Sequence, residues 1–167
     1  MGGSVVSIQS IYKTLEKLVI IHEELCGVSK EKTDILKKGS VENFQHLLAK
    51  ERKYIKILEQ FELKRQREVE QWYASHQLAT EEMTITNMLQ IIANEVEKKK
   101  LENITIKLTN AITQLKQQEQ LNQDLIRQSM QFVHMSLEML NPTINQMNYG
   151  NKKVREAENR SVFDSQA

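Results

Sequence analysis

The sequence predicts an all-α protein, and two features of its composition and pattern lead to that prediction. The 167 residues include only five glycines and one proline, too few to supply the turns of a many-stranded protein. Apolar residues make up 40% of the chain, and over long stretches they recur at the three- and four-residue spacing of helices. We therefore expect an elongated antiparallel three-helix bundle or coiled coil, followed by a flexible C-terminal tail.

The length fits a single helical-bundle domain, which we place at residues 1–142. Its helices are expected at about 5–38, 41–75 and 80–140, and the last of these can break near 94–100. Residues 143–167 are polar and charged with few apolar positions, which predicts a flexible tail.

The first helix is predicted from an apolar seam at coiled-coil spacing, formed by Ile8, Ile11, Leu15, Leu18, Leu25 and Leu36. His22 falls on this seam, and we expect a neighbouring group to satisfy its ring nitrogen. Cys26 is the single cysteine and is expected to be a small buried residue. Gly39 suits the left-handed position after a helix, and Ser40 suits the cap of the next helix.

The second helix carries a similar stripe: Phe44, Leu47, Leu48, Tyr54, Ile55, Leu58, Phe61, Val69 and Trp72. The very short break before it predicts an antiparallel hairpin with the first helix. Glu51 and Arg65 interrupt the stripe. We expect them to pair with charges on the neighbouring helices and to set the register, as polar core residues do in coiled coils.

The last helical stretch begins with Thr80 as its expected cap, and it carries an apolar seam at Leu101, Ile104, Leu108, Ile112 and Leu115. Gln118 and Asn122 interrupt that seam, so we expect poor packing there and different roles for the two halves of the helix. Pro142 ends it, because proline disfavours helical geometry at the preceding residue.

The sequence lacks the parts of an enzyme site, so neither catalysis nor a cofactor is expected. No Glu-x-x-His pair of a di-iron bundle is present, and there is no glycine-rich phosphate loop. His134 and Glu138 lie four residues apart, but one such pair cannot complete a metal shell.

Charge and hydropathy exclude two classes of partner. Lys and Arg number 23 against 22 Asp and Glu, and glutamates flank the basic runs at 64–67 and 98–100, so no nucleic-acid binding is expected. The longest aliphatic run, at 18–21, is too short for membrane insertion. The N-terminus shows no leader pattern, which predicts a cytoplasmic protein.

The end of the last helix is apolar around most of its circumference. We expect it to bind a helical ligand through Leu125, Ile126, Met130, Phe132, Val133, Met135, Leu137, Met139 and Leu140. Methionine suits a surface that repacks against different helices. The alternative is that this end is buried in the bundle or in a homodimer.

Several stretches together resemble the FlgN family of flagellar export chaperones: the hairpin at 37–66, "QSMQFVHMSLEMLNP" at 128–142, "YG" at 149–150 and "RSVFDSQA" at 160–167. The resemblance implies a cytosolic chaperone of flagellum biogenesis and type III protein export. Its clients would be the hook-associated proteins FlgK and FlgL, whose C-terminal helical segments it would keep from assembling prematurely and help bring to the export gate.

Two roles are expected for the tail. A flexible tail can fold Val162 and Phe163 over the bound helix or over the empty groove. The resemblance implies in addition that a tail aromatic contacts the export gate protein FlhA, with Tyr149 as the first candidate and Phe163 as the second. A self-assembling structural or adaptor coiled coil remains the alternative function. Gln118 and Asn122 favour the chaperone, because a self-assembling rod would gain from an unbroken seam.

Overall fold

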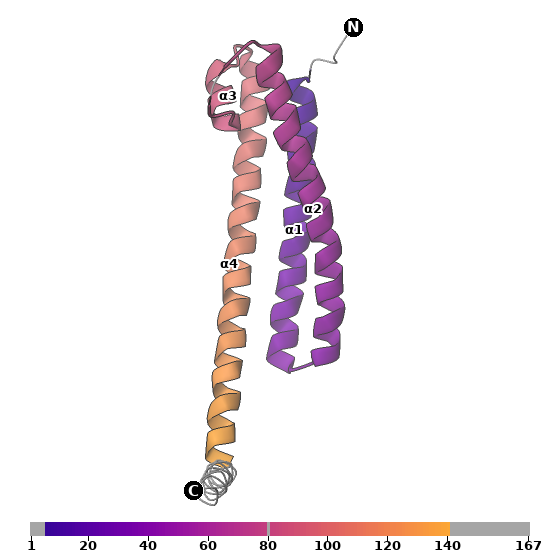
Figure 1. The fold of residues 1–167 in the computed structure, drawn as a ribbon, viewed down its shortest axis with the longest axis vertical. Helices are drawn as coiled ribbons and strands as arrows, with labels where there is room; N and C mark the ends of the chain where they lie inside the picture. Colours follow the sequence, from indigo (N-terminus) through magenta and orange to yellow (C-terminus); the bar gives the residue numbers. More distant parts are fainter. Residues whose placement is uncertain (1–5, 80, 141–167) are drawn as a thin grey trace, which may run out of the picture. The chain divides into compact units, whose positions relative to one another are not determined.

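The computed structural model describes residues 6–79 and 81–140, and these contain four helices and no strand (Figure 1). The helices are α1 (Ile8–Lys38), α2 (Val41–Ser75), α3 (Ile85–Ile91) and α4 (Glu95–Leu140). The all-α prediction is confirmed, and the helix packing fits a bundle. None of these four helices combines the length and the apolar character needed to cross a membrane.

The chain divides into two compact units, residues 1–125 and residues 126–167. The first unit contains α1, α2, α3 and α4 up to Leu125. The described part of the second unit is the end of α4, residues 126–140.

Helices α1 and α2 form a hairpin whose turn is set by Gly39. This residue has a φ of 72°, and its amide donates to the carbonyl oxygen of Ile35 at 2.9 Å. Glycine adopts that left-handed conformation without the steric cost of a Cβ atom, which ends α1 as predicted. Ser40 occupies the N-cap position of α2, but its side chain makes no capping hydrogen bond.

Contacts along the hairpin show that α2 runs back along α1 (Figure 1). Ser10 bonds to Glu68, Tyr54 donates to Glu24 at 3.3 Å, and Lys50 lies 3.8 Å from Glu31. Residue numbers therefore rise on one helix as they fall on the other.

The core of the first unit joins all four helices. Its most deeply buried side chains include Ile11, Leu15, Leu18, Val69, Tyr73, Met88 and Leu101. The Tyr73 hydroxyl donates to the carbonyl oxygen of Thr84 at 2.8 Å, so the most deeply buried aromatic side chain also satisfies a loop carbonyl group. Trp72 packs edge-on against the Tyr73 ring at 5.3 Å between centroids. This cluster holds α3 and the start of α4 against the hairpin.

The connection between α2 and α4 contains the short helix α3, and the last helical stretch is interrupted next to the expected break near 94–100. Residues 81–84 are not helical, and α3 starts at Ile85 because the Thr84 hydroxyl caps it by accepting from the Asn87 amide at 3.1 Å. The expected cap Thr80 lies outside the described residues. After α3, the Asn94 side chain caps α4 by accepting from the amide of Val96 at 3.0 Å. The chain therefore breaks between Ile91 and Glu95.

Within the first unit, α4 packs along α1. The amine of Lys100 donates to Gln9 at 3.1 Å near the start of both helices. Further along, Asn122 donates to Ser29 at 2.9 Å. Residue numbers thus rise together on α1 and α4.

Candidate functional site

The end of α4 exposes a large apolar surface, here called the α4 apolar face. It consists of Ile126, Met130, Phe132, Val133, Met135, Leu137, Met139 and Leu140. Their exposed fractions run from 38% for Ile126 to 79% for Met139, although side chains of these types are usually buried. Apolar side chains gathered on one surface mark a place where another molecule can bind.

One row of this face has the spacing of a helix-pairing seam. Ile126, Met130, Val133, Leu137 and Leu140 follow one another at intervals of four, three, four and three residues. With Ser129 and His134, the first four of them line a hollow of about 430 Å³. A helix with a matching apolar stripe could place its side chains there.

A second apolar row lies on another side of the helix. Phe132, Met135 and Met139 are three and four residues apart, so they share a side of the helix. At about 100° per residue, this row is turned well away from the Val133 row, and the two together span more than half of the circumference.

The remaining side of this helix end is polar. The Nε2 atom of His134 lies 3.3 Å from Glu138, and both side chains are exposed, so the expected pairing of these two residues is present. It becomes an ion pair when the imidazole is protonated. A solvated polar side opposite the apolar rows makes residues 126–140 amphipathic.

Of the nine residues predicted from the sequence to bind a helical ligand, eight form the α4 apolar face and Leu125 is half-buried. The binding role of these residues stays a prediction. Tyr149, Val162 and Phe163 lie outside the described residues.

Sequence reasoning missed a cluster of polar side chains between α1, α2 and α4, here called the polar cluster. It consists of Ser29, Lys32, Thr33, Glu51, Gln118, Glu119 and Asn122. The expectation that Gln118 and Asn122 leave α4 poorly packed is wrong, because Asn122 is only 3% exposed and bonds to Ser29 and Thr33. The available signal was three polar residues, Ser29, Lys32 and Thr33, within one turn of an otherwise apolar seam.

Glu51 and Arg65 have different partners from one another. Glu51 pairs with Lys32 of α1, as a charge linking two helices was expected to do. The same expectation is wrong for Arg65, which pairs with Glu62 of its own helix at 2.6 Å. Three residues along a helix bring two side chains onto neighbouring positions, so a local partner was in reach.

Lys32 is nearly buried, with 7% of its side chain exposed, and its amine also lies 2.9 Å from Glu119 of α4. Burial alone would lower the pKa of this amine. The hydrogen bonds that the amine donates to Glu51 and Glu119, together with the negative charge of these carboxylates, outweigh burial, so the pKa of Lys32 is raised above its ordinary value. The amine therefore stays charged and links three helices.

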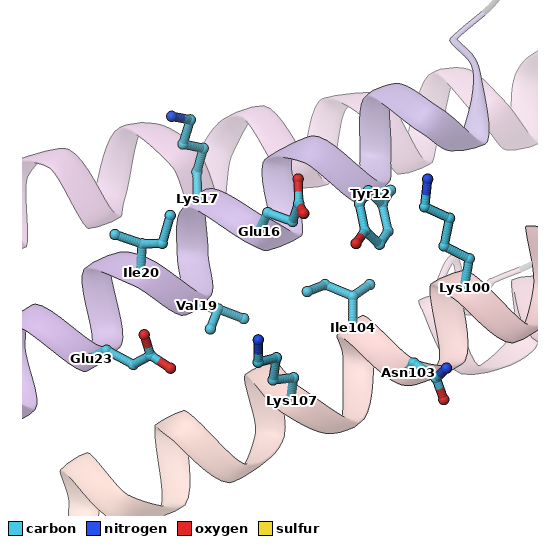
Figure 2. A pocket seen from close by; sticks show the side chains of 10 residues that line it. All are labelled: Tyr12, Glu16, Lys17, Val19, Ile20, Glu23, Lys100, Asn103, Ile104 and Lys107. Carbon is cyan, nitrogen blue, oxygen red and sulfur yellow. The ribbon is translucent and has the colours of Figure 1, made fainter.

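Another hollow, of about 430 Å³, lies between α1 and α4 in the first unit, and Figure 2 shows the side chains that line it. Val19 and Ile104 are buried, while Lys17, Glu23 and Lys107 are exposed to solvent. The Lys100 amine lies 4.4 Å from the centre of the Tyr12 ring. A hydrogen bond to Glu16 is the main cause that raises the pKa of Tyr12.

The chemistry of this hollow is that of a mixed-charge surface. Its ten lining residues include no histidine and no cysteine. In the part of the chain that the structure describes, no three His, Cys, Asp or Glu side chains are grouped so that they could hold a metal ion. The α4 apolar face is therefore the better candidate for a functional site.

Fold and site together define a class: a helical protein with an amphipathic helix end whose apolar side is exposed. The model of the FlgN protein family matches residues 1–157, and the chain belongs to that family, as its sequence suggested. FlgN proteins are flagellar export chaperones that bind flagellar proteins, and the family is not known for enzymes.

One curated relative extends over almost the whole chain. The "Uncharacterized protein YvyG" of Bacillus subtilis (strain 168) is 30% identical over 164 residues, which cover 96% of this chain and 99% of the relative. No solved structure matches the chain.

Proposed function

We propose that this protein is a cytoplasmic chaperone of flagellar type III export whose clients are hook-associated proteins of the FlgK and FlgL kind. Membership of the FlgN family supports the chaperone role. The single observation that supports a binding site for client helices is the exposure of the α4 apolar face, with Phe132 at 72% and Leu137 at 57%.

The mode of binding follows from the spacing of the apolar side chains. A client's amphipathic C-terminal helix lays its apolar stripe along Ile126, Val133 and Leu137 and adds one helix to α4. Each aliphatic side chain that becomes fully buried contributes roughly 1.5–3 kcal/mol, before the costs of association are subtracted. While the client's helix is covered, it is unavailable for premature assembly. Binding of this kind needs no nucleotide.

The tail has two parts in the proposal. Val162 and Phe163 fold over the bound client helix or over the empty face, and the ordering cost of the segment keeps client affinity in a reversible range. Tyr149 contacts the export gate protein FlhA, with Phe163 as the second candidate.

A self-assembling coiled-coil protein is the second candidate function, and one observation favours it. The row from Ile126 to Leu140 has the four-three spacing through which identical helices also pair. A homodimer through this row would cover the same side chains as a client helix.

Size-exclusion chromatography with light scattering separates the two functions. The protein is measured alone and mixed with the C-terminal helical segment of a hook-associated protein from the same bacterium. The proposal predicts a stoichiometric complex that is lost in the Phe132→Asp/Leu137→Asp variant, while that variant keeps wild-type helicity in circular dichroism. A stable oligomer that does not respond to the client segment would support self-assembly.

A further inference from the structure

The polar cluster lies wholly within the first compact unit and contacts three helices. Its hydrogen-bonded part centres on Asn122, whose amide nitrogen donates to the carbonyl oxygen and to the hydroxyl oxygen of Ser29, both at 2.9 Å. The oxygen of the same amide accepts from the Thr33 hydroxyl. Gln118 then donates to Thr33 at 2.6 Å.

Its charged part lies beside these hydrogen bonds. The Lys32 amine of α1 bonds to Glu51 of α2 and lies 2.9 Å from Glu119 of α4. Lys32 and Asn122 are almost completely buried, at 5% and 3% exposed. Among the described residues, every buried side-chain nitrogen and oxygen has a hydrogen-bond partner. The cluster is therefore fully satisfied in the observed arrangement.

Apolar contacts alone would define the register of α4 weakly. Leu101, Ile104, Leu108 and Ala111 are three or four residues apart, so a shift of α4 by one turn places one small or aliphatic side chain near the position of another. The polar contacts do not tolerate that shift. A displacement of one turn, about 5.4 Å, separates Asn122 from Ser29 and Glu119 from Lys32, and leaves buried polar groups without partners.

We propose that the polar cluster is a register lock, which fixes α4 against the α1–α2 hairpin at one axial position. The directional hydrogen bonds from Asn122 to α1 distinguish this axial position of α4 from the others. Lys32 links α2 to the same arrangement through its ion pair with Glu51. The lock lies one helical turn before the α4 apolar face in the sequence. It does not depend on the identity of the ligand that this face binds.

The single cysteine of the chain offers a direct measure of this register. Cys26 of α1 lines a hollow of about 400 Å³ with Gln114, Gln117, Gln118 and Leu121 of α4. A second cysteine is introduced at one α4 position at a time, and dibromobimane, which fluoresces when it joins two thiols, reports which positions face Cys26. Gln117→Cys and Leu121→Cys report the observed register. Asn110→Cys and Leu125→Cys report shifts of α4 in either direction, and Lys116→Cys is the control on the opposite side of the helix.

With the lock intact, the bridge should form at positions 117 and 121 at least about tenfold faster than at 110 and 125, because the latter are displaced by a turn or more. Asn122→Leu should reduce that preference to about twofold or less, because leucine makes no directional hydrogen bond to Ser29 or Thr33, and should lower the melting temperature by a few degrees, because these buried groups lose a partner. Retention of the tenfold preference in the folded Asn122→Leu protein would overturn the proposal.

Thr33→Val provides the second variant, because it removes only the hydroxyl that joins Gln118 to Asn122 and keeps the size of the side chain. The proposal predicts an intermediate preference between positions 117 and 125, about threefold to fivefold. If Asn122→Leu does not fold, the preference measured in Thr33→Val tests the proposal in its place. A wild-type preference in Thr33→Val would contradict the lock.

Discussion

Lys32 shows how a single charged residue becomes part of a helical interior. Its amine has lost most of its contact with water, and such a loss disfavours the charged form unless partners replace the solvent. Glu51 and Glu119 are those partners, and they come from two other helices. The raised pKa of Lys32 records that the attraction to these carboxylates exceeds the effect of burial. Stability that depends on this charge must therefore depend on pH.

The predicted pH dependence follows from the direction of the shift. Because the pKa of Lys32 in the folded state is above its ordinary value of 10.5, its contribution is fully present below that value and is lost as the pH rises through the folded pKa. Urea unfolding at about pH 8 and about pH 11 should therefore show a smaller loss of unfolding free energy in Lys32→Met than in the wild type. Equal losses in both proteins would show that this amine contributes no pH-dependent stability.

Individual helices were predictable to different degrees. The α1–α2 hairpin followed from long apolar seams and from Gly39, since a left-handed residue ends a helix by its local conformation. The start of α3 was not predictable at the same level. Both Thr80, which two glutamates follow, and Thr84 are acceptable caps by sequence. Met88 and Ile92 are buried in the core, and this burial is a tertiary contact that a local pattern does not show.

The candidate site was likewise predictable from the sequence only in part. The apolar residues at the end of α4 were evident from the sequence, whereas their exposure depends on what the rest of the chain covers. The pairing of Asn122 with Ser29 joins residues 93 positions apart, and a local pattern cannot reveal such a contact.

Gly39 gives a prediction at the level of the hairpin. Gly39→Ala should lower the free energy of unfolding by about 1–2 kcal/mol, because alanine is strained at positive φ. No atom lies within 4 Å of the added Cβ atom, so the effect is one of backbone conformation and not of crowding. Chemical denaturation measures it.

Gly27 is the matched control. It lies inside α1, is exposed and also has free space around an added Cβ atom. Gly27→Ala should raise the unfolding free energy by about 0.5–1 kcal/mol, since alanine favours the helix. If Gly39→Ala left stability unchanged or raised it as Gly27→Ala does, the left-handed conformation of Gly39 would not be what ends α1.

At the scale of the whole molecule, the buried core and the α4 apolar face belong to different compact units of the chain. The buried core cluster draws its members from Ile11 to Ile104, all in the first compact unit, and the apolar face lies in the second. Under the proposed function, a chaperone that must both keep its fold and release its client benefits from this separation, because the side chains proposed to bind are not those that hold the core together. Substitutions on the face should then change binding without unfolding the protein.

Removal of residues 141–167 tests the independence of the core. The truncated protein should melt within about 3 °C of the full chain, because the described members of the core cluster all come before the deleted part. Thermal unfolding followed by circular dichroism gives the comparison. A much lower melting temperature would mean that the deleted residues stabilise the core.

The proposal that client helices bind to the α4 apolar face is tested most directly by a fluorescence anisotropy titration. The labelled molecule is the C-terminal helical segment of a hook-associated protein. The wild type is compared with Leu137→Asp and with Gln131→Asp, which introduces the same charge at an exposed polar position of the same helix. We predict that Leu137→Asp raises the Kd at least about 30-fold, or about 2 kcal/mol, and that Gln131→Asp changes it less than about threefold. Equal affinity of all three proteins for the segment would contradict the α4 apolar face as the client-binding site.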